Sequence, residues 1–155
     1  MHLIIHDNKW RFQLLSEGLL RIEYSPKGKF TDTPSAVVIE RPETLPFMDE
    51  KVLGDHFLIT GGAFEIRIRT AKSDLPFSEQ LLISWERGGR SGSRTLSHDA
   101  SNLGGDFFSL DLCGQGDRTP RSRDGVLSRE GCYLFDDTPS PLLDETGNLT
   151  VRPDP

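Results

Sequence analysis

Alternation of apolar and polar side chains at every second residue is the feature that most constrains the fold of this chain. In residues 64–69, Phe and Ile alternate with Glu and Arg, and in residues 20–24, Leu, Ile and Tyr alternate with Arg and Glu. Successive side chains of a β-strand point to opposite faces, so the pattern predicts strands with one buried and one solvent-exposed face. Such strands are typical of antiparallel sheets.

Other segments have the length and composition of short strands. They are residues 10–15, 36–41, 56–60, 81–86 and 132–135. Residues 25–28 predict a β-turn, Gly61-Gly62 predicts a hairpin over residues 57–69, and Glu17-Gly18 predicts another turn. No segment follows a helical period and no internal repeat is found. Seven or more short strands with frequent turns predict an all-β fold, an antiparallel β-sandwich.

The length and net charge of the chain limit the classes of protein to which it can belong. A chain of 155 residues suits one domain. The net charge of −6 argues against non-specific nucleic-acid binding and gives no reason to expect an anionic membrane partner. No apolar run approaches the roughly 18 residues of a membrane helix, and the N-terminus lacks the pattern of a signal peptide. We therefore expect a cytoplasmic location.

The chain contains few candidates for metal-ligating or catalytic residues. The histidines and cysteines are His2, His6, His56, His98, Cys113 and Cys132. None of them follows a metal-ligand spacing, and no serine lies in a nucleophile-elbow motif. The two cysteines could pair if their strands are neighbours, although without an export signal we expect reduced thiols. The sequence thus predicts no metal, no cofactor and no catalytic residue.

Three polar segments have the composition of connections between strands. Residues 87–95 and 114–125 are rich in Gly, Ser and Arg but lack the spacing of a phosphate-binding loop, so we interpret both as flexible, solvated loops. Residues 136–148 are acidic without the regular spacing of a calcium loop, and we interpret them as a turn-rich connection.

Four sequence blocks occur in a fixed order. They are R-I-E-Y-S at residues 21–25, F-T-D-T-P at 30–34, N-L-G-G-D-F-F-S-L-D at 102–111, and G-V-L-S-R-E-G at 125–131 followed by D-D-T at 136–138. Together they resemble the N-terminal region of glycoside hydrolase family 31, the α-glucosidases, α-xylosidases and their relatives. The resemblance spans nearly the whole chain. It implies that residues 1–155 form a galactose-mutarotase-like β-sandwich.

The same resemblance implies a function. In that family both catalytic aspartates lie in a (β/α)₈ barrel, which needs about 250 residues. This chain lacks the barrel, so we expect a non-catalytic N-terminal domain, truncated from its enzyme, whose partners are the barrel and carbohydrate. In several members an Arg-Asp step of a sandwich loop touches the sugar. Arg129-Glu130 is the matching position, with Glu130 replacing the aspartate and Cys132 replacing a tryptophan.

Other interpretations remain open. Arg129 and Glu130 could form only an exposed turn in which the arginine pairs with Glu130 or Asp136. A free-standing carbohydrate-binding module would need exposed aromatic rings, whereas we interpret Trp10 and Trp85 as core residues. A mutarotase-type epimerase would need a histidine beside a carboxylate, and neither His56 nor His98 has a partner that the sequence identifies.

The resemblance also predicts an unusually apolar face, because such a domain packs on a barrel. The candidates are Phe107, Phe108, Leu110, Leu127, Tyr133 and Phe135. Left uncovered, this face would favour self-association. Alternatively, all six side chains lie inside the sandwich.

Overall fold

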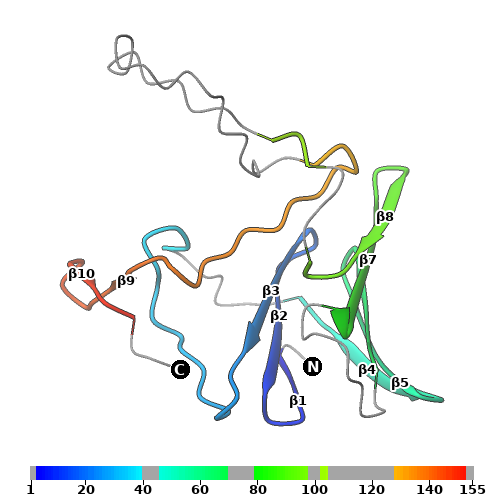
Figure 1. The fold of residues 1–155 in the computed structure, drawn as a ribbon, viewed down its shortest axis with the longest axis horizontal. Coiled ribbons are helices and arrows are strands. Elements are labelled where there is room, and N and C mark those ends of the chain that lie inside the picture. The colour runs from blue at the N-terminus through cyan, green and yellow to red at the C-terminus, as the bar shows by residue number, and fades with distance from the viewer. Residues whose placement is uncertain (1–2, 40–45, 70–78, 98–101, 105–127, 153–155) are drawn as a thin grey trace, which may run out of the picture. The chain divides into compact units, whose positions relative to one another are not determined.

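The computed structural model describes residues 3–39, 46–69, 79–97, 102–104 and 128–152 (Figure 1). Within these residues all regular secondary structure is β, apart from a 3₁₀ position at Glu79, and every strand pairing is antiparallel. The all-β, antiparallel prediction is therefore confirmed. The chain divides into two units, Met1–Leu96 with Asp136–Pro155, and Ser97–Phe135.

The first unit begins with a three-stranded sheet. Strands β1 (Leu3–His6), β2 (Trp10–Ser16) and β3 (Leu19–Tyr24) pair in the order β1-β2-β3. The first hairpin turns through Asp7 and Asn8, whose φ angles are 51° and 53°. Asp and Asn tolerate this left-handed region better than most residues, so the local sequence suits the turn.

A five-stranded sheet follows in the same unit. It contains β4 (Asp49–Leu53), β5 (His56–Gly61), β6 (Phe64–Arg69), β7 (Leu81–Arg87) and β8 (Arg90–Arg94). Their order is β4-β5-β6-β7-β8, so each strand pairs with its neighbour in sequence. The predicted hairpin at Gly61-Gly62 is present, because Gly61 pairs with Phe64 and Gly62 has a φ of 53°. The predicted turns at residues 25–28 and 17–18 are also found.

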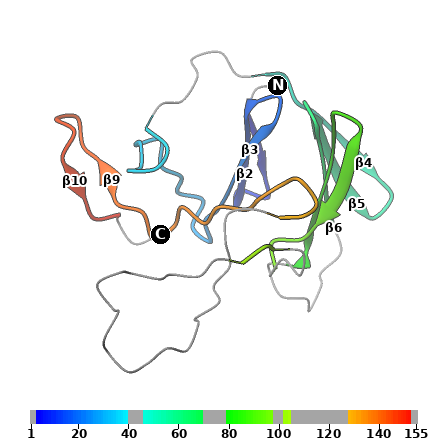
Figure 2. The same cartoon turned by 90° about the horizontal axis from the view of Figure 1, so that it is seen from above.

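Both sheets contribute to one hydrophobic core, which gives the first unit a sandwich-like architecture (Figure 2). Its buried members are Ile4, Trp10, Phe12, Leu14, Met48, Ile59, Ile66, Ile68, Leu81 and Ile83. In β6 the alternation works as predicted, since Ile66 and Ile68 are buried while Arg67 and Arg69 are exposed. Trp10 and Trp85 are both buried, as interpreted from the sequence.

A short hairpin near the C-terminus joins the segment that follows β3. Strands β9 (Leu142–Leu143) and β10 (Leu149–Thr150) pair with each other, and Ser35 forms an isolated bridge with Leu142. The Ala36 amide donates to the Pro141 carbonyl at 2.9 Å, and the Leu143 amide donates to the Pro34 carbonyl at 2.8 Å. Residues 136–148 are otherwise mostly turns, as expected.

Three local predictions were wrong. The described part of segment 36–41 is not a strand, because the Ser35 hydroxyl accepts hydrogen bonds from the Val37 and Val38 amides and turns the chain. Residues 132–135 form no strand either. Residues 87–95 are not a flexible loop, since they contain a Gly88-Gly89 turn and β8, with glycine φ angles of 59° and 74°. Residues 114–125 lie outside the described ranges.

The described part of the second unit is small. Asn102 bridges to Ser128, and the Asn102 Oδ1 atom accepts the Gly104 amide at 2.7 Å. A turn follows, in which the Gly131 amide donates to the Ser128 carbonyl at 3.2 Å. Across the described parts of the chain, no helix is long and apolar enough to cross a membrane.

Candidate functional site

The most elaborate polar arrangement in the first unit lies on the outer face of the three-stranded sheet. We call it the outer cluster, and it consists of Arg11, Gln13, Arg21, Glu23, Thr31 and Asp32. Strand register creates it: Arg11 is opposite Glu23 and Gln13 is opposite Arg21, on the face that points away from Phe12 and Leu14. Directly opposed residues of an antiparallel pair have their Cβ atoms about 5 Å apart, close enough for ion pairing.

Arg11 is the centre of the outer cluster. Although it is a charged residue, it is only 4% exposed. Its Nε donates to Glu23 Oε2 at 2.5 Å, Nη1 to Asp32 Oδ1 at 2.7 Å, and Nη2 to the Thr31 carbonyl at 2.7 Å. All three guanidinium nitrogens therefore have acceptors, which is what a buried arginine requires.

Arg21 completes the arrangement from β3. Its Nη1 donates to Gln13 Oε1 at 2.7 Å, and its Nη2 donates to Glu23 Oε1 at 2.6 Å and to the Thr31 carbonyl at 2.8 Å. Arg21 Nη1 also lies 3.7 Å from Asp32 Oδ1, so the two arginines share both carboxylates and one backbone carbonyl. Two positive and two negative charges balance, so the outer cluster has no excess charge to offer a ligand.

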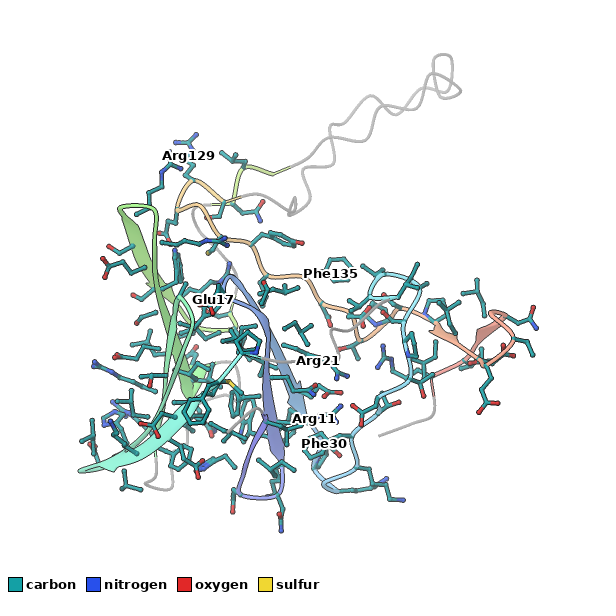
Figure 3. The ribbon with its side chains drawn as sticks, turned by 180° about the vertical axis from the view of Figure 1, so that it is seen from behind. Arg11, Glu17, Arg21, Phe30, Arg129 and Phe135 are labelled. Carbon is teal, nitrogen blue, oxygen red and sulfur yellow. The ribbon has the colours of Figure 1, made fainter. Side chains whose placement is uncertain are left out.

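The outer cluster attaches residues 30–32 to the sheet. The Arg11 guanidinium lies 5.1 Å from the centroid of the Phe30 ring, within the range of a cation–π contact. Figure 3 shows Arg11, Arg21 and Phe30 gathered on the same side of the sheet. The outer cluster therefore has a structural role, because it holds the segment between β3 and Ser35 against the sheet.

A second polar contact holds the far end of that chain. Ser35 is fully buried and its hydroxyl donates to Asp137 Oδ1 at 2.9 Å. Arg152 Nη2 donates to the Asp137 carbonyl at 3.0 Å and lies 3.3 Å from Asp137 Oδ2. Asp137 therefore connects the C-terminal hairpin to the segment after β3.

The predicted sugar-contacting residues lie together in an exposed turn of the second unit. Arg129 and Glu130 are both exposed, and the Glu130 amide donates to the Ser128 hydroxyl at 3.3 Å (Figure 3). The turn itself is as predicted. Whether these two side chains contact a sugar stays a prediction.

The histidines occupy different environments. His56 Nδ1 lies 2.6 Å from Asp55 Oδ1 in the β4–β5 turn, so His56 has a carboxylate partner that no sequence pattern indicated. The His6 ring packs against the Phe57 ring, with centroids 4.3 Å apart and planes tilted by 31°. Burial lowers the pKa of His6, while Asp7 and Glu50 oppose this shift. His98 lies outside the described residues. No group of three metal-ligating side chains occurs among the residues that the structure describes.

An open hollow of about 860 Å³ lies along β5 to β8. Its lining includes Glu65, Ser84 and Glu86 as well as the aromatic residues Phe64 and Trp85. Glu65 is already paired with Arg67, whose Nη2 lies 2.7 Å from Glu65 Oε1. The hollow is open to solvent and its lining is mainly polar, whereas a small-molecule pocket is typically enclosed and mainly apolar.

Two of the six residues predicted for an apolar face are described. Tyr133 is 58% exposed and Phe135 is 43% exposed, and Leu134 between them is also exposed. The alternative that all six lie inside the sandwich is therefore excluded for these two. Phe107, Phe108, Leu110 and Leu127 lie outside the described residues.

No protein-family model and no curated protein matches this chain.

Proposed function

We propose that this chain is the non-catalytic N-terminal domain of a family 31 α-glycosidase, a galactose-mutarotase-like sandwich that packs on the catalytic barrel. The observation that carries the proposal is contact between the sequence blocks of the resemblance. Each block was recognised separately along the chain, and residues of different blocks meet within each unit. A chance resemblance offers no reason for such contacts.

The first two blocks meet in the outer cluster. Arg21 and Glu23 belong to R-I-E-Y-S, while Phe30 and Asp32 belong to F-T-D-T-P. Arg11 joins them, because its guanidinium contacts Glu23, Asp32 and the Phe30 ring. The Arg, Glu and Asp of these blocks thus serve as structural ion pairs, which supports their use as a signature of the fold.

The remaining blocks make contacts in two further places. Ser35 directly follows F-T-D-T-P, and its hydroxyl bonds to Asp137 of D-D-T. In the second unit, Asn102 of N-L-G-G bridges to Ser128 of the G-V-L-S-R-E-G block. Each block, or in one case the residue directly after it, therefore contacts another part of the chain that a block identifies.

The exposed side chains of the second unit support a partner and a sugar contact. Arg129 and Glu130 project from a turn with no burial to overcome, so both can reach a bound sugar; an arginine and a carboxylate supply charge-assisted hydrogen bonds to hydroxyl groups. The exposure of Tyr133 and Phe135 supports a covering surface, since large apolar side chains usually mark an interface when they cluster.

The reading frame that follows Pro155 tests this proposal directly. We expect it to encode a (β/α)₈ barrel of about 250 residues. A frame that continues into an unrelated domain would contradict the proposal. The chain alone should leave aryl α-glucosides and α-xylosides unhydrolysed, because the paired carboxyl groups of a retaining glycosidase lie about 5–5.5 Å apart in the absent barrel.

The role of the turn needs the intact enzyme. There, Arg129→Ala should raise KM for an α-glucoside about tenfold, the loss of one charge-assisted hydrogen bond. Arg67→Ala, on the first unit, is the matched control and should leave KM unchanged. Equal KM values for both variants would remove Arg129 from the sugar site while leaving the family assignment to the reading-frame test.

A free-standing carbohydrate-binding module is the second candidate, favoured by the spacing of two exposed rings. Tyr133 and Phe135 are two residues apart, which in an extended chain places their side chains on one side about 7 Å from each other. Rings in such an arrangement can stack on successive sugar units. Titration of the chain with maltotriose checks this, and the candidate fails if Tyr133→Ala and wild type give the same response.

A further inference from the structure

The described parts of the chain leave the outer side of the five-stranded sheet exposed. The sheet runs from β4 to β8 (cyan to green in Figure 1). Its inner side supplies Ile59, Ile66 and Ile83 to the core, so the residues that alternate with them point outward. We call this outward side the five-strand face. Its side chains are open to a partner, since Arg67 is 54% exposed and Leu82 is 37% exposed.

Strand register gathers the basic side chains in one half of the five-strand face. Lys51 and Arg67 lie in one row across the sheet, because both are opposite the same residue of β5. Arg69 lies in the next row of β6, opposite His56. Asp55, in the β4–β5 turn, lies 2.6 Å from His56 Nδ1 and is therefore already engaged. We call the region of Lys51, Arg67 and Arg69 the basic half.

The acidic side chains occupy the other half. Asp49 and Glu65 share one row, because both are opposite Thr60. Glu86 lies one row further away on β7, two residues after Ser84, which is opposite Glu65. The open hollow described above lies over this acidic half, and its lining includes Thr60, Glu65, Ser84, Glu86, Ser91 and Ser93. The acidic half is therefore concave as well as opposite in charge to the basic half.

Each half contains one charge that has no ion-pair partner within the described parts of the chain. The charges near the centre pair along single strands, as Lys51 Nζ does with Asp49 Oδ2 at 3.2 Å. Arg69 and Glu86, by contrast, form no salt bridge with any described residue. Their rows are roughly 20 Å apart along the strands, so the two cannot pair with each other.

We propose that the five-strand face binds a second copy of this chain, turned end over end about a two-fold axis that lies in the interface and runs across the strands. The basic half of each copy then covers the acidic half of the other, as a self-complementary contact requires. Lys51 meets Asp49 of the second copy, and Arg69 meets Glu86 of the second copy. Stacked sheets lie about 10 Å apart, a gap that long basic side chains and carboxylates span together.

A second copy fits the five-strand face better than a partner of one charge sign. A nucleic acid or a uniformly charged peptide would be attracted to one half and repelled by the other. The net charge of −6 belongs to the rest of the chain, because the bases and acids of the two halves balance. Repulsion between the net charges is screened at physiological salt, where the Debye length is about 8 Å. The proposal stands independently of the family assignment.

The size of the five-strand face indicates a weak dimer. The rows and strands that carry the charges cover about 20 Å by 20 Å, so two copies bury roughly 800–1,000 Å² in total. Interfaces at this low end belong to transient complexes. We therefore expect a Kd of about 0.1–1 mM, with the dimer dissociating on dilution.

Sedimentation equilibrium of the chain from about 0.05 to 1 mM, in about 0.15 M salt, tests the proposal. Lys51→Glu/Arg69→Glu reverses two charges of the basic half, and Asp49→Lys/Glu86→Lys reverses two charges of the acidic half. Each variant alone should dimerise at least about tenfold more weakly than wild type, because like charges then face each other. An equimolar mixture of the two variants should associate within about threefold of wild type, since every reversed charge faces an opposite one.

A matched control separates the five-strand face from the net charge. Lys9→Glu/Lys29→Glu changes the net charge as much as the basic-half variant does, at two exposed residues outside the five-stranded sheet. It should dimerise within about twofold of wild type, with all circular dichroism spectra unchanged. A wild-type chain that stays monomeric at about 1 mM overturns the proposal. So does a mixture of the two reversal variants that fails to associate, or a control that weakens dimerisation as much as they do.

Discussion

Replacing Arg11 by alanine removes the centre of the outer cluster. The substitution deletes three hydrogen bonds, to Glu23, to Asp32 and to the Thr31 carbonyl. It also deletes the contact with the Phe30 ring. We expect unit 1 to remain folded but to lose a large share of its stability.

The expected loss of stability depends on which interactions each partner of Arg11 retains in the variant. Glu23, 18% exposed at its side chain, loses one charge-assisted bond worth about 1.5–3 kcal/mol but keeps Arg21 at 2.6 Å. Asp32, 73% exposed, is rehydrated and accounts for less than about 1 kcal/mol. The Phe30 contact adds about 0.5–1 kcal/mol. The expected cost is about 2–5 kcal/mol, similar to the cost of leaving one buried charge without its partner.

Urea denaturation followed by tryptophan fluorescence measures this cost, because Trp10 lies in the adjacent core. In a thermal scan it should appear as a fall in Tm of about 5–15 °C. Arg67→Ala is the control: that arginine is 54% exposed in a surface pair with Glu65 and should cost less than about 1 kcal/mol. Equal costs for the two variants would refute the conclusion that Arg11 organises this face.

Three further outcomes are expected. Burial lowers the pKa of His6, so the folded chain favours the neutral ring; stability should be complete above about pH 6.5 and decline as the pH falls below it, and His6→Gln should flatten that decline in pH-dependent urea titrations. Ser35→Ala leaves Asp137 without its buried donor and should cost about 1–3 kcal/mol in the same assay. Gly92→Ala places a methyl group against the Trp85 ring and should cost about 1–3 kcal/mol, with a change in near-UV circular dichroism that an unchanged spectrum would contradict.

The fold could be predicted where side-chain alternation is strong. Strand β6 has a clear period of two and was found as predicted, whereas β4 is exposed along its whole length and offers no buried face to detect. Residues 87–95 were misassigned because glycine and serine suggested flexibility. A Gly-Gly pair between two short polar segments is also typical of a hairpin turn, so the local sequence did contain a pattern that predicts this hairpin.

The outer cluster was not predicted because alternation assigns Arg21 and Glu23 only to the side opposite the apolar residues. No local sequence pattern indicates that residues 30–32 return to cover that face. This long-range contact is what buries Arg11. The Arg129-Glu130 turn, by contrast, depends on four consecutive residues and was correctly expected as a turn.

The joint between residues 34–36 and 141–143 has a consequence for folding kinetics. Both large sheets are meanders, and apart from the β6–β7 connection their hairpins close through short loops and can form early. Ser35 and Asp137 are 102 residues apart, and closing such a loop costs about 2 kcal/mol more than closing one of ten residues. We therefore expect the joint to form after the transition state, so that weakening it accelerates unfolding and leaves the folding rate almost unchanged.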